Sequence, residues 1–565
     1  MSATNIPPAL QHGKPPGVVR IEAIASQLTT ARRWVIFSSI FLVSYVTGLD
    51  FLVRGAYVPY ATSSFSNHSL LSTINVLRAV VAAAVQPCAA RLTDVFGRVE
   101  VYSFAILLST VGTVAEAVSV NVQGFAAGAV LHQLGYTLSA LTIVILIADI
   151  TSVKNRMFFT FVSNWPFLIN CFIGGNITSA VLSVTTWRWG IGMFAIMIPA
   201  SALPLVVTML VLDRQAKQAN AEHEHGTSPF RLRSVQDLLW ELDVIGVLIL
   251  TAALAMTLVP LTLAGGQDSK WQDAGILAPL IIGVLLLPAF VLWESRTISP
   301  VLPLHLLRDR TVWACLTISC AFPFAFMVHG NYLFSLLVVS YDFSIEAATR
   351  VASLYSFCAV VSGTVVGVIL IKVRRLKAFI LAGILLWFVG AGLVYHYRGG
   401  ADSQAGLIGG EIVIGTAAGL FSWTTLVMIQ TAAQHQVVGI LISLVFTVNS
   451  IGQALGNCVS GAIWSQTLFG ELRRNLGDET LAASVYASPL AVVPGVPLGS
   501  PERDAIVVSY RMVQRVLTIV AMCVTAVMLV VALFLRDPVL SDRQTQPEAD
   551  AAALDKVRRM EGERE

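Results

Sequence analysis

Ionisable side chains inside long apolar stretches are the residues with the most evident chemistry in this sequence. Asp50 lies near the middle of the apolar stretch 36–60, and Arg54 follows one helical turn later on the same face. Arg78 lies at a comparable depth in the next apolar stretch. Burial disfavours a charged carboxylate and a nearby guanidinium favours it, so Asp50 could exchange a proton. We predict Asp50 as a proton-coupling group with Arg54 and Arg78 as its charge partners; a fixed structural ion pair is the alternative.

A second carboxylate of this kind is Glu411, in the apolar stretch 405–430. Glu411 is the second predicted proton-coupling group, and His132 and His329 are weaker candidates. Glu116 lies near the end of an apolar stretch, where we expect it to be hydrated or paired with basic loop residues.

The composition places these charges in a membrane. Of 565 residues, 12% are Asp, Glu, Lys or Arg and 56% are apolar, and the mean hydropathy is +0.75. Soluble domains carry about 25% charged residues, so this chain has too few to hydrate a surface of its own. The net charge of +3 does not favour a nucleic-acid partner, and the seven cysteines, all in apolar stretches, form no disulfide or zinc pattern.

Apolar stretches of about 18–27 residues, long enough to cross a bilayer, repeat along the chain. They predict an all-α membrane protein of about fourteen helices, over 36–60, 71–90, 100–119, 124–148, 157–180, 189–212, 243–263, 275–293, 312–338, 347–371, 378–397, 405–430, 437–469 and 512–535. The corresponding organisation is a tail (1–35), a six-helix bundle (36–212), a loop (213–242), two extra helices (243–293), a loop (294–311), a second six-helix bundle (312–535) with a long outer segment (470–511), and a tail (536–565).

Basic residues set the orientation, because they are enriched in cytosolic segments. If both termini are cytosolic, the outer segments hold few of the 36 Lys and Arg residues, namely Arg188, Lys270, Arg350, Arg398, Arg473, Arg474, Arg503 and Arg511. We therefore predict cytosolic N- and C-terminal tails.

The segment Ala90-Arg91-Leu92-Thr93-Asp94-Val95-Phe96-Gly97-Arg98 is the sharpest local motif. It resembles the G-x-L-x-D-x-x-G-R loop of the major facilitator superfamily, with Ala90 in place of the first glycine. Gly97 would permit a tight turn, and Asp94 could bond a helix N-terminus and a basic partner. A charged loop that only sets topology is the alternative.

Two further residues, Asp149 and Arg156, complete the predicted cytosolic lock between rocking bundles. Asp149 would pair with Arg98 or with Arg156.

Drug/proton antiporters of the same superfamily carry an arginine in the fourth span, but Leu131 stands at that position here, and the stretches Asn164-Trp165-Pro166 and Gly174-Gly175 replace their fifth-span glycine motif. These differences count against drug efflux.

Over roughly 40–540 the chain resembles the fungal siderophore–iron transporter family. The resemblance rests on segments in the expected order: Pro59 to Phe65, Leu70 to Ile74, Asp94 to Glu100, Gly135-Tyr136-Thr137, Ala148 to Thr151, Asn155-Arg156, Gly392 to Arg398, Gln430 to Gln436, Ser460 to Trp464, Arg503 to Ile506, Tyr510 and Gln514-Arg515. The resemblance implies fourteen spans, two six-helix bundles with two extra spans between them, and proton-driven uptake of ferric siderophores.

A hydroxamate siderophore surrounds Fe(III) with six oxygens of its own, so the carrier needs no metal ligand and no cofactor. The nine scattered histidines agree with that expectation. A cavity for such a cargo would offer aromatic faces, hydroxyls and amides. The candidates, each with ordinary helix packing or interfacial anchoring as the alternative, are Tyr57, Tyr60, Gln133, Tyr136, Asn331, Tyr332, Trp423 and Gln430.

The outer segment 470–511 is long, polar and rich in proline and glycine. By similarity to the family, Arg503 and Tyr510 are candidates for capturing or gating the siderophore, and an unstructured connector is the alternative. Asn67 and Asn176 begin glycosylation sequons close to predicted helix ends.

Together these features predict a proton-coupled secondary transporter that imports ferric hydroxamate siderophores by alternating access, and not an enzyme. Export of a drug or secondary metabolite by proton antiport is the alternative. The expected partners are the ferric siderophore, protons and the lipid bilayer, and the expected state is a monomer. We expect the plasma membrane, with an endosomal vesicle as the alternative.

Overall fold

The protein is described here from a computed structural model. It describes residues 20–21, 24, 28–151, 163–221, 240, 242–264, 271–297, 300, 307, 309–398, 403–431 and 435–537. Within these residues the side chains of 90, 94, 148, 216–221, 371 and 435–440 are not described.

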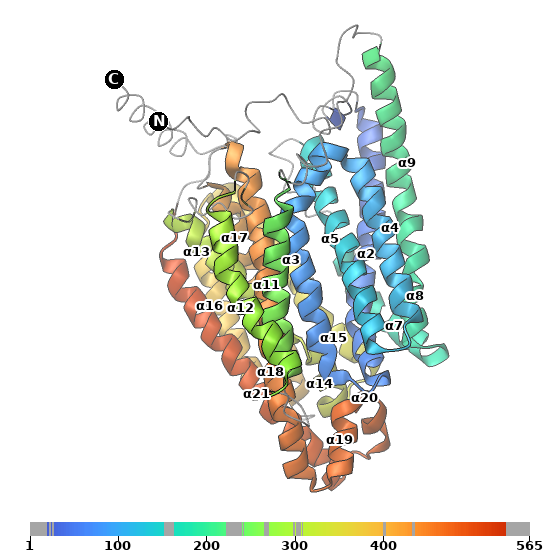
Figure 1. The fold of residues 1–565 in the computed structure, drawn as a ribbon, viewed down its shortest axis with the longest axis vertical. Helices are drawn as coiled ribbons and strands as arrows, with labels where there is room; N and C mark the ends of the chain where they lie inside the picture. The colour runs from blue at the N-terminus through green and yellow to red at the C-terminus, as the bar shows by residue number, and fades with distance from the viewer. Residues whose placement is uncertain are drawn as a thin grey trace.

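The described chain is almost entirely helical and holds fourteen helical segments that are long and apolar enough to cross a membrane (Figure 1). The prediction of a fourteen-span helical membrane protein is confirmed. In chain order the helices are α2 (Thr30–Ser64), α3 (Leu71–Phe96), α4 (Arg98–Val118), α5 (Val122–Ile150), α7 (Pro166–Val184), α8 with α9 (Trp187–Gly192 and Phe194–Ala221), α11 (Val244–Leu263), α12 (Ala274–Glu294), α13 with α14 (Arg310–Gly330 and Leu333–Tyr341), α15 (Ile345–Val373), α16 (Lys377–Tyr397), α17 (Gln404–Thr431), α18 (His435–Leu476) and α21 (Pro501–Leu533).

The two halves of the chain meet along two seams, where α3 packs on α18 and α7 packs on α15. We refer to α2–α9 as the first half and to α13–α21 as the second half. Between them in sequence, α11 packs against both α3 and α18 and so covers one seam, while α12 contacts α11. Apolar side chains of α12 such as Ile281, Leu285 and Leu292 are exposed, as expected for a surface that faces lipid.

Glycines bring α4 and α5 into backbone contact. A Cβ at Gly112 would lie 2.2 Å from the His132 nitrogen, and one at Gly135 would lie 2.3 Å from the Ser109 nitrogen. Small residues allow this close approach of transmembrane helices. The contact places His132 of α5 beside the end of α4, where a buried carboxylate lies.

The outer segment differs from its prediction, because it is largely helical. Helix α18 continues to Leu476, and α19 (Glu479–Ala487), α20 (Pro489–Val492) and η5 (Val493–Gly495) follow before α21 begins at Pro501. Figure 1 shows α19 and α20 at the end of the bundle opposite to the end of α9. The alternative of an unstructured connector is therefore wrong for the described residues, and the last span begins eleven residues earlier than 512.

Prolines at the start of two helices explain why the sequence suggested a loop here. Pro489 and Pro501 each occupy the first turn of a helix, where the missing N–H is not needed and the fixed φ favours helix. The Ser500 side chain also accepts a hydrogen bond from the Arg503 nitrogen, which caps α21. These prolines start helices rather than interrupt a chain.

Candidate functional site

The first half contains a closed network of four charges, contributed by α2, α3 and α4. Arg54 donates from Nε and Nη2 to both carboxylate oxygens of Asp50 at 2.8–3.3 Å, and from Nη1 to Glu116 Oε2. Arg78 donates from Nη2 to Glu116 Oε1 at 2.9 Å. Asp50, Arg54 and Glu116 are at most 4% exposed. Because two acids and two bases face one another, the network is electrically balanced.

His132 connects this network to an aromatic path. Its Nε2 lies 3.2 Å from Asp50 Oδ2, and its ring stacks near Tyr136 with 6.2 Å between centroids. Tyr136 in turn stacks with Phe51 at 6.4 Å. Phe51, the residue that follows Asp50, lines a cavity between the two halves, so a chain of ring contacts through His132 and Tyr136 connects the Asp50 carboxylate with the wall of that cavity.

The second half carries a smaller cluster on α13, α16, α17 and α21. Glu411 Oε1 lies 3.1 Å from His329 Nε2. Arg398 donates from Nη2 to the His329 carbonyl at 3.1 Å and from Nη1 to Gln514 Oε1. His329, Arg398, Glu411 and Gln514 are all buried. In the described structure Arg398 is bonded to a carbonyl and an amide, and its Nη2 lies 3.5 Å from Nδ1 of the His329 imidazole that Glu411 contacts from the Nε2 side.

Two members of these clusters contradict the sequence-based expectation. Glu116 was expected to be hydrated or paired with a loop, but the end of α4 is covered by α8, whose Arg188 donates to the carbonyls of Ala117 and Ser119. Arg398 was assigned to an outer loop. It caps α16 and is buried where the Tyr341 hydroxyl donates to the Tyr397 carbonyl at 2.8 Å.

A cavity of about 290 Å³ lies between the halves, toward the end where α7 begins and α17 ends, which the charge distribution predicts to be cytosolic. Its described wall combines aromatic and aliphatic side chains with amides and hydroxyls, and none of the described residues lining it is charged. The polar and aromatic lining residues are Phe51, Asn164, Phe167, Ser319, Phe322, Tyr355, Ser356, Phe421, Ser422, Trp423, Thr425, Phe446 and Asn449.

Of the eight predicted cavity residues, Trp423 lies in this wall, and Tyr136 lies behind it against Phe51. The other six lie outside the described lining. Gln133 and Gln430 donate to Thr137 Oγ1 and to the Leu426 carbonyl of their own helices, both at 3.1 Å.

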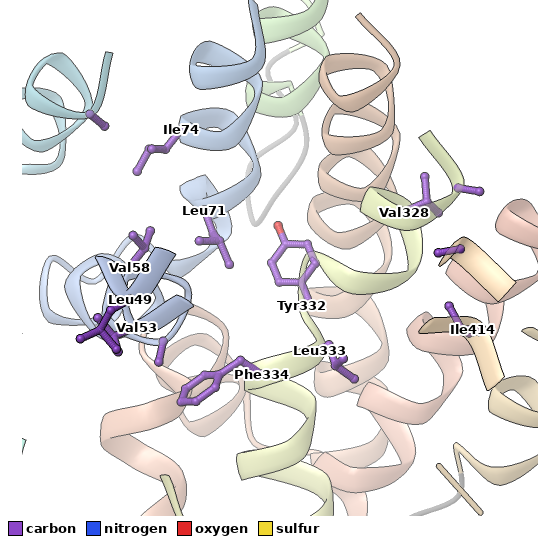
Figure 2. Packing of buried hydrophobic residues seen from close by; sticks show 14 of the residues in the cluster. Leu49, Val53, Val58, Leu71, Ile74, Val328, Tyr332, Leu333, Phe334 and Ile414 are labelled. Carbon is purple, nitrogen blue, oxygen red and sulfur yellow. The ribbon is translucent and has the colours of Figure 1, made fainter. Parts of the chain in front are cut away.

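The remaining four cavity candidates lie on the outer side. Tyr57 is fully buried against Gly190. Tyr60 of the first half packs edge-on against Phe334 of the second half. Asn331 and Tyr332 form the break between α13 and α14, and Figure 2 shows Tyr332 between α3, which carries Leu71 and Ile74, and the helices of the second half. The contacts of these four residues are those of helix packing, which was the alternative for each of them.

The outer candidates Arg503 and Tyr510 are buried rather than presented to a ligand. Arg503 donates to the Val493 carbonyl at 2.8 Å and to Asp342 at 3.3 Å, and so ties η5 to α14. Tyr510 packs edge-on against Trp464, with 5.3 Å between ring centroids. Both residues therefore connect α21 to neighbouring elements, Arg503 to η5 and α14 and Tyr510 to α18.

The cytosolic motif forms a tight turn at Gly97, whose φ is 100°. Arg98 donates from Nε to Asp149 at 2.9 Å and from Nη1 to the Thr93 carbonyl at 2.8 Å. The first of the two pairs suggested for Asp149 is thus present. Arg156 and the Asp94 side chain lie outside the described residues.

An arginine that the sequence did not single out joins this region from the N-terminal tail. Arg20 donates to Glu100 at 2.6 Å and, with two nitrogens, to Asp213. The Asp213 carboxylate raises the pKa of the Arg20 guanidinium above its ordinary value. Arg20 therefore ties the start of α4 to the cytosolic part of α9.

The two sequon asparagines have local partners. Asn67 donates to the Phe65 carbonyl at 2.6 Å. Asn176 lies within α7 and accepts a hydrogen bond from Arg350 of α15 at 2.6 Å. Glycosylation of either residue stays a prediction.

The helices and the central cavity are those of a major facilitator carrier. Residues 36–457 match the family model described as the Major Facilitator Superfamily. The fold is similar to the crystal structure of a bacterial homologue of the human lysosomal transporter Spinster in an inward-facing and occupied conformation. That comparison has a TM-score of 0.57 and 14% identity and covers 90% of this chain and 98% of the other. The structure of the nucleoside transporter NupG gives 0.52 with 13% identity, covering 87% and 99%.

Sequence comparison narrows the class. The chain is 40% identical over 519 residues to siderophore iron transporter ARN1 of Saccharomyces cerevisiae, which covers 90% of this chain and 82% of the relative. It is 34% identical over 532 residues to siderophore iron transporter 1 of Schizosaccharomyces pombe (94% and 86%) and 32% identical over 540 residues to MFS siderochrome iron transporter C of Aspergillus fumigatus (94% and 88%). The chain belongs to the fungal siderophore iron transporters of the major facilitator superfamily, a family of multi-pass membrane transporters, and the resemblance seen in the sequence is confirmed.

Proposed function

We propose that this protein imports ferric siderophores of the hydroxamate class, as intact complexes, together with the inward movement of protons. The relatives are named siderophore iron transporters, which supports the cargo class. The observation that carries the finer proposal is the uncharged aromatic wall of the cavity between the halves.

The charge of the cargo explains why that wall matters. Three hydroxamates neutralise Fe(III), whereas three catecholates leave the complex with a charge of about −3 by simple valence. An anion of that charge would need basic groups in a site from which water is partly excluded. Ring faces such as those of Phe51, Tyr355 and Trp423, with the amides of Asn164 and Asn449, suit a neutral, polar-surfaced complex instead.

Iron crosses, in this proposal, within its chelator and without ligands from the protein. Among the described residues, no three His, Cys, Asp or Glu side chains are grouped so that they could hold a metal ion. The proposal needs no cofactor, and the driving force is the proton gradient.

Glu411 is the better supported proton-exchanging group. Asp50 is held by two nitrogens of Arg54 and lies beside His132, so protonating it would leave the network with a net positive charge. The described contact of the Glu411 carboxylate is with the His329 imidazole, a group that can itself accept a proton. We propose that Glu411 and His329 take up and release the transported proton, and that Asp50 is the alternative.

The test is uptake in a fungus that lacks its own siderophore carriers. Cells expressing the chain receive labelled ferric tris-hydroxamate or ferric tris-catecholate, with and without a protonophore. We expect uptake of the hydroxamate complex and its loss on adding the protonophore. A gallium complex of the same hydroxamate, which cannot be released by reduction, should enter equally well; exclusion of gallium, or export of the cargo, would contradict the proposal.

Two matched variants test the proton assignment. Glu411→Gln should abolish protonophore-sensitive accumulation while retaining exchange of labelled for unlabelled cargo, because exchange needs no net proton movement. Asp50→Asn should retain pH-driven accumulation if the protein remains folded. The opposite pattern would assign coupling to Asp50. The same proposal includes uptake at the cell surface, rather than from a vesicle, which microscopy tests. It also includes a monomeric carrier, which light scattering of the purified protein tests.

A further inference from the structure

Hydrogen bonds between the first half and the second half close the outer side of the cavity. The His68 Nε2 atom of η2 (His68–Leu70) lies 3.2 Å from Ser335 Oγ of α14. Asn75 of α3 donates to Asn331 Oδ1 at 2.7 Å. The Ser488 hydroxyl before α20 donates to the Ser63 carbonyl of α2 at 2.7 Å. Each of these bonds joins the first half to the second, so all three must break when the outer side opens. We call this set the outer gate.

Aromatic side chains enclose the centre of the outer gate. Tyr332 and Trp464 stack with 3.8 Å between centroids and 5° between planes. His68 meets both rings edge-on, at 6.2 and 6.3 Å. The His68 side chain is completely buried.

The contacts of His68 fit a neutral imidazole. Its Nδ1 lies 3.4 Å from Thr62 Oγ1 and 3.3 Å from Ser63 Oγ. The Thr62 proton is already used toward the carbonyls of Val58 and Pro59, so Thr62 can only accept. A ring that donates from Nδ1 and accepts the Ser335 proton at Nε2 satisfies every contact.

A protonated ring would have no counter-ion here. None of the ion pairs of the described residues includes His68. The titratable groups around it include three tyrosines: Tyr332, Tyr486 of α19, which bonds Ser69, and Tyr510 behind Trp464. Charged groups on the elements around the gate form ion pairs with one another, in the pairs Asp342–Arg503, Glu471–Arg474, Glu479–Arg473, Asp50–Arg54 and Arg78–Glu116.

From this geometry we propose that His68 is the proton-sensing residue of the outer gate. The closed gate holds the neutral ring between Thr62 and Ser335, and protonation from outside favours the open gate, where water surrounds the charge. This inference rests on the proposed function in one respect: the same outward acidity that drives import would open the carrier toward its cargo. It adds a second proton-dependent step, separate from Glu411.

The size of the effect follows from linkage. A state that binds a proton is favoured over one that excludes it by the factor 1 + 10^(pKa − pH). A hydrated imidazole titrates near pH 6.5, so this factor is about 1.1 at pH 7.5 and about 33 at pH 5.0. The outward-open population should rise about 30-fold over this range while it remains the minor state.

The experiment measures exposure of the gate without any cargo. Ser72, fully buried at the start of α3 and against Gly461 of α18, is replaced by cysteine in the full chain. The protein is placed in lipid nanodiscs, and its labelling by a hydrophilic maleimide is measured as the increase over the chain without this cysteine. Rates are divided by those of the unfolded protein at the same pH, which removes the titration of the thiol itself.

We expect the normalised rate to rise about 30-fold between pH 7.5 and pH 5.0, with a midpoint that reflects an ordinary imidazole. His68→Gln, and His68→Asn as a second replacement, should make the rate independent of pH within about twofold. Ser335→Ala should raise the rate at pH 7.5 and preserve the rise in acid. His396→Gln, at an exposed imidazole near the outer end of α16, is the matched control and should behave as the parent.

A flat profile of the parent, or an undiminished rise in a folded His68 variant, would overturn the inference. The parent profile tests it even if both His68 variants misfold. Because labelling needs no siderophore, a carrier that fails to import ferric hydroxamates but shows the His68-dependent profile would refute the proposed function alone.

Discussion

Replacing Glu116 by glutamine is the sharpest test of the charge network in the first half. Glu116 Oε1 and Oε2 accept from Arg78 and Arg54, and the carboxylate is completely buried. The amide keeps the shape of the side chain and removes its charge. Two guanidinium groups would then face a single carboxylate, that of Asp50.

The expected cost is set by the uncompensated charge rather than by lost packing. Breaking a buried ion pair by removing one partner costs about 3–5 kcal/mol. For a unit of the size of one bundle, 1 kcal/mol corresponds to about 2–4 °C in the midpoint of thermal unfolding. Glu116→Gln should therefore lower that midpoint by about 10 °C. The matched control is Glu346→Gln, which removes an exposed pair with Arg350 and should change stability by less than about 1 kcal/mol.

The assay is thermal unfolding of the purified protein, followed by loss of the monodisperse peak in size-exclusion chromatography. A second substitution, Arg78→Gln, removes the guanidinium that Glu116→Gln leaves unpaired. In the double variant Asp50 and Arg54 balance each other again, so part of the loss should be recovered. The coupling between positions 78 and 116 should be at least about 1 kcal/mol, in the range found for contacting groups.

Two results would refute this reasoning. If Glu116→Gln unfolded at the temperature of the control, the network would be hydrated, and the burial of Glu116 would be wrong. If the effects of Glu116→Gln and Arg78→Gln simply added, the two side chains would not form a pair.

Three further predictions concern the cavity, the cytosolic turn and the seam. Trp423→Ala should raise the KM for cargo about tenfold in concentration-dependent uptake, because it removes a ring from the wall, whereas Gln430→Ala should change KM by less than about twofold, because that amide bonds its own helix. Gly97→Ala should destabilise the protein by about 1–2 kcal/mol in thermal unfolding, because φ is 100° and an added Cβ would lie 2.6 Å from a carboxylate oxygen. Ser353→Cys places a thiol beside Cys171 of the other half, where Sγ and Oγ are now 2.9 Å apart; oxidation should stop uptake and dithiothreitol should restore it, while the parent chain should not respond.

Hydropathy was sufficient to predict the spans because a bilayer demands continuous apolar helices. It was insufficient at the outer end, where the helices are too short to span a bilayer and where the prolines and glycines suggested a loop. Position in the sequence also misplaced Glu116 and Arg398, since both lie at span ends that other elements cover. A span end is hydrated only if nothing packs on it, and a single sequence does not contain that information.

His68 illustrates the same limit. A lone histidine between two predicted spans has the sequence context of a loop, and the residues that bury it, Ser335 and Trp464, are more than 260 positions away in the chain. The signal that could have indicated it is the shortness of the connection, because α2 ends at Ser64 and α3 begins at Leu71. So short a connection holds its side chains close to the helix ends, where the other half can reach them.

The two buried clusters are related by helix order and differ in charge. The first, third and fourth helices of the first half contribute Asp50, Glu116 and His132, and the corresponding helices of the second half contribute His329, Arg398 and Glu411. Halves of this superfamily are structural repeats, so the three helices that carry each cluster correspond. A helix that carries an acid in one half corresponds to a helix that carries an imidazole or a base in the other.

The difference in charge between the two clusters affects which of them can take up a proton. In the first half two arginines hold both carboxylates, so a proton entering that network would leave an uncompensated positive charge. In the second half the Glu411 carboxylate meets the His329 imidazole, and the Arg398 guanidinium is bonded to a carbonyl and an amide and lies 3.5 Å from His329 Nδ1. Protonating Glu411 would therefore break no ion pair with an arginine among the described residues. A proton gradient is used only where protonation alters the balance between states. These contacts are the reason for proposing proton exchange in the second half rather than in the first.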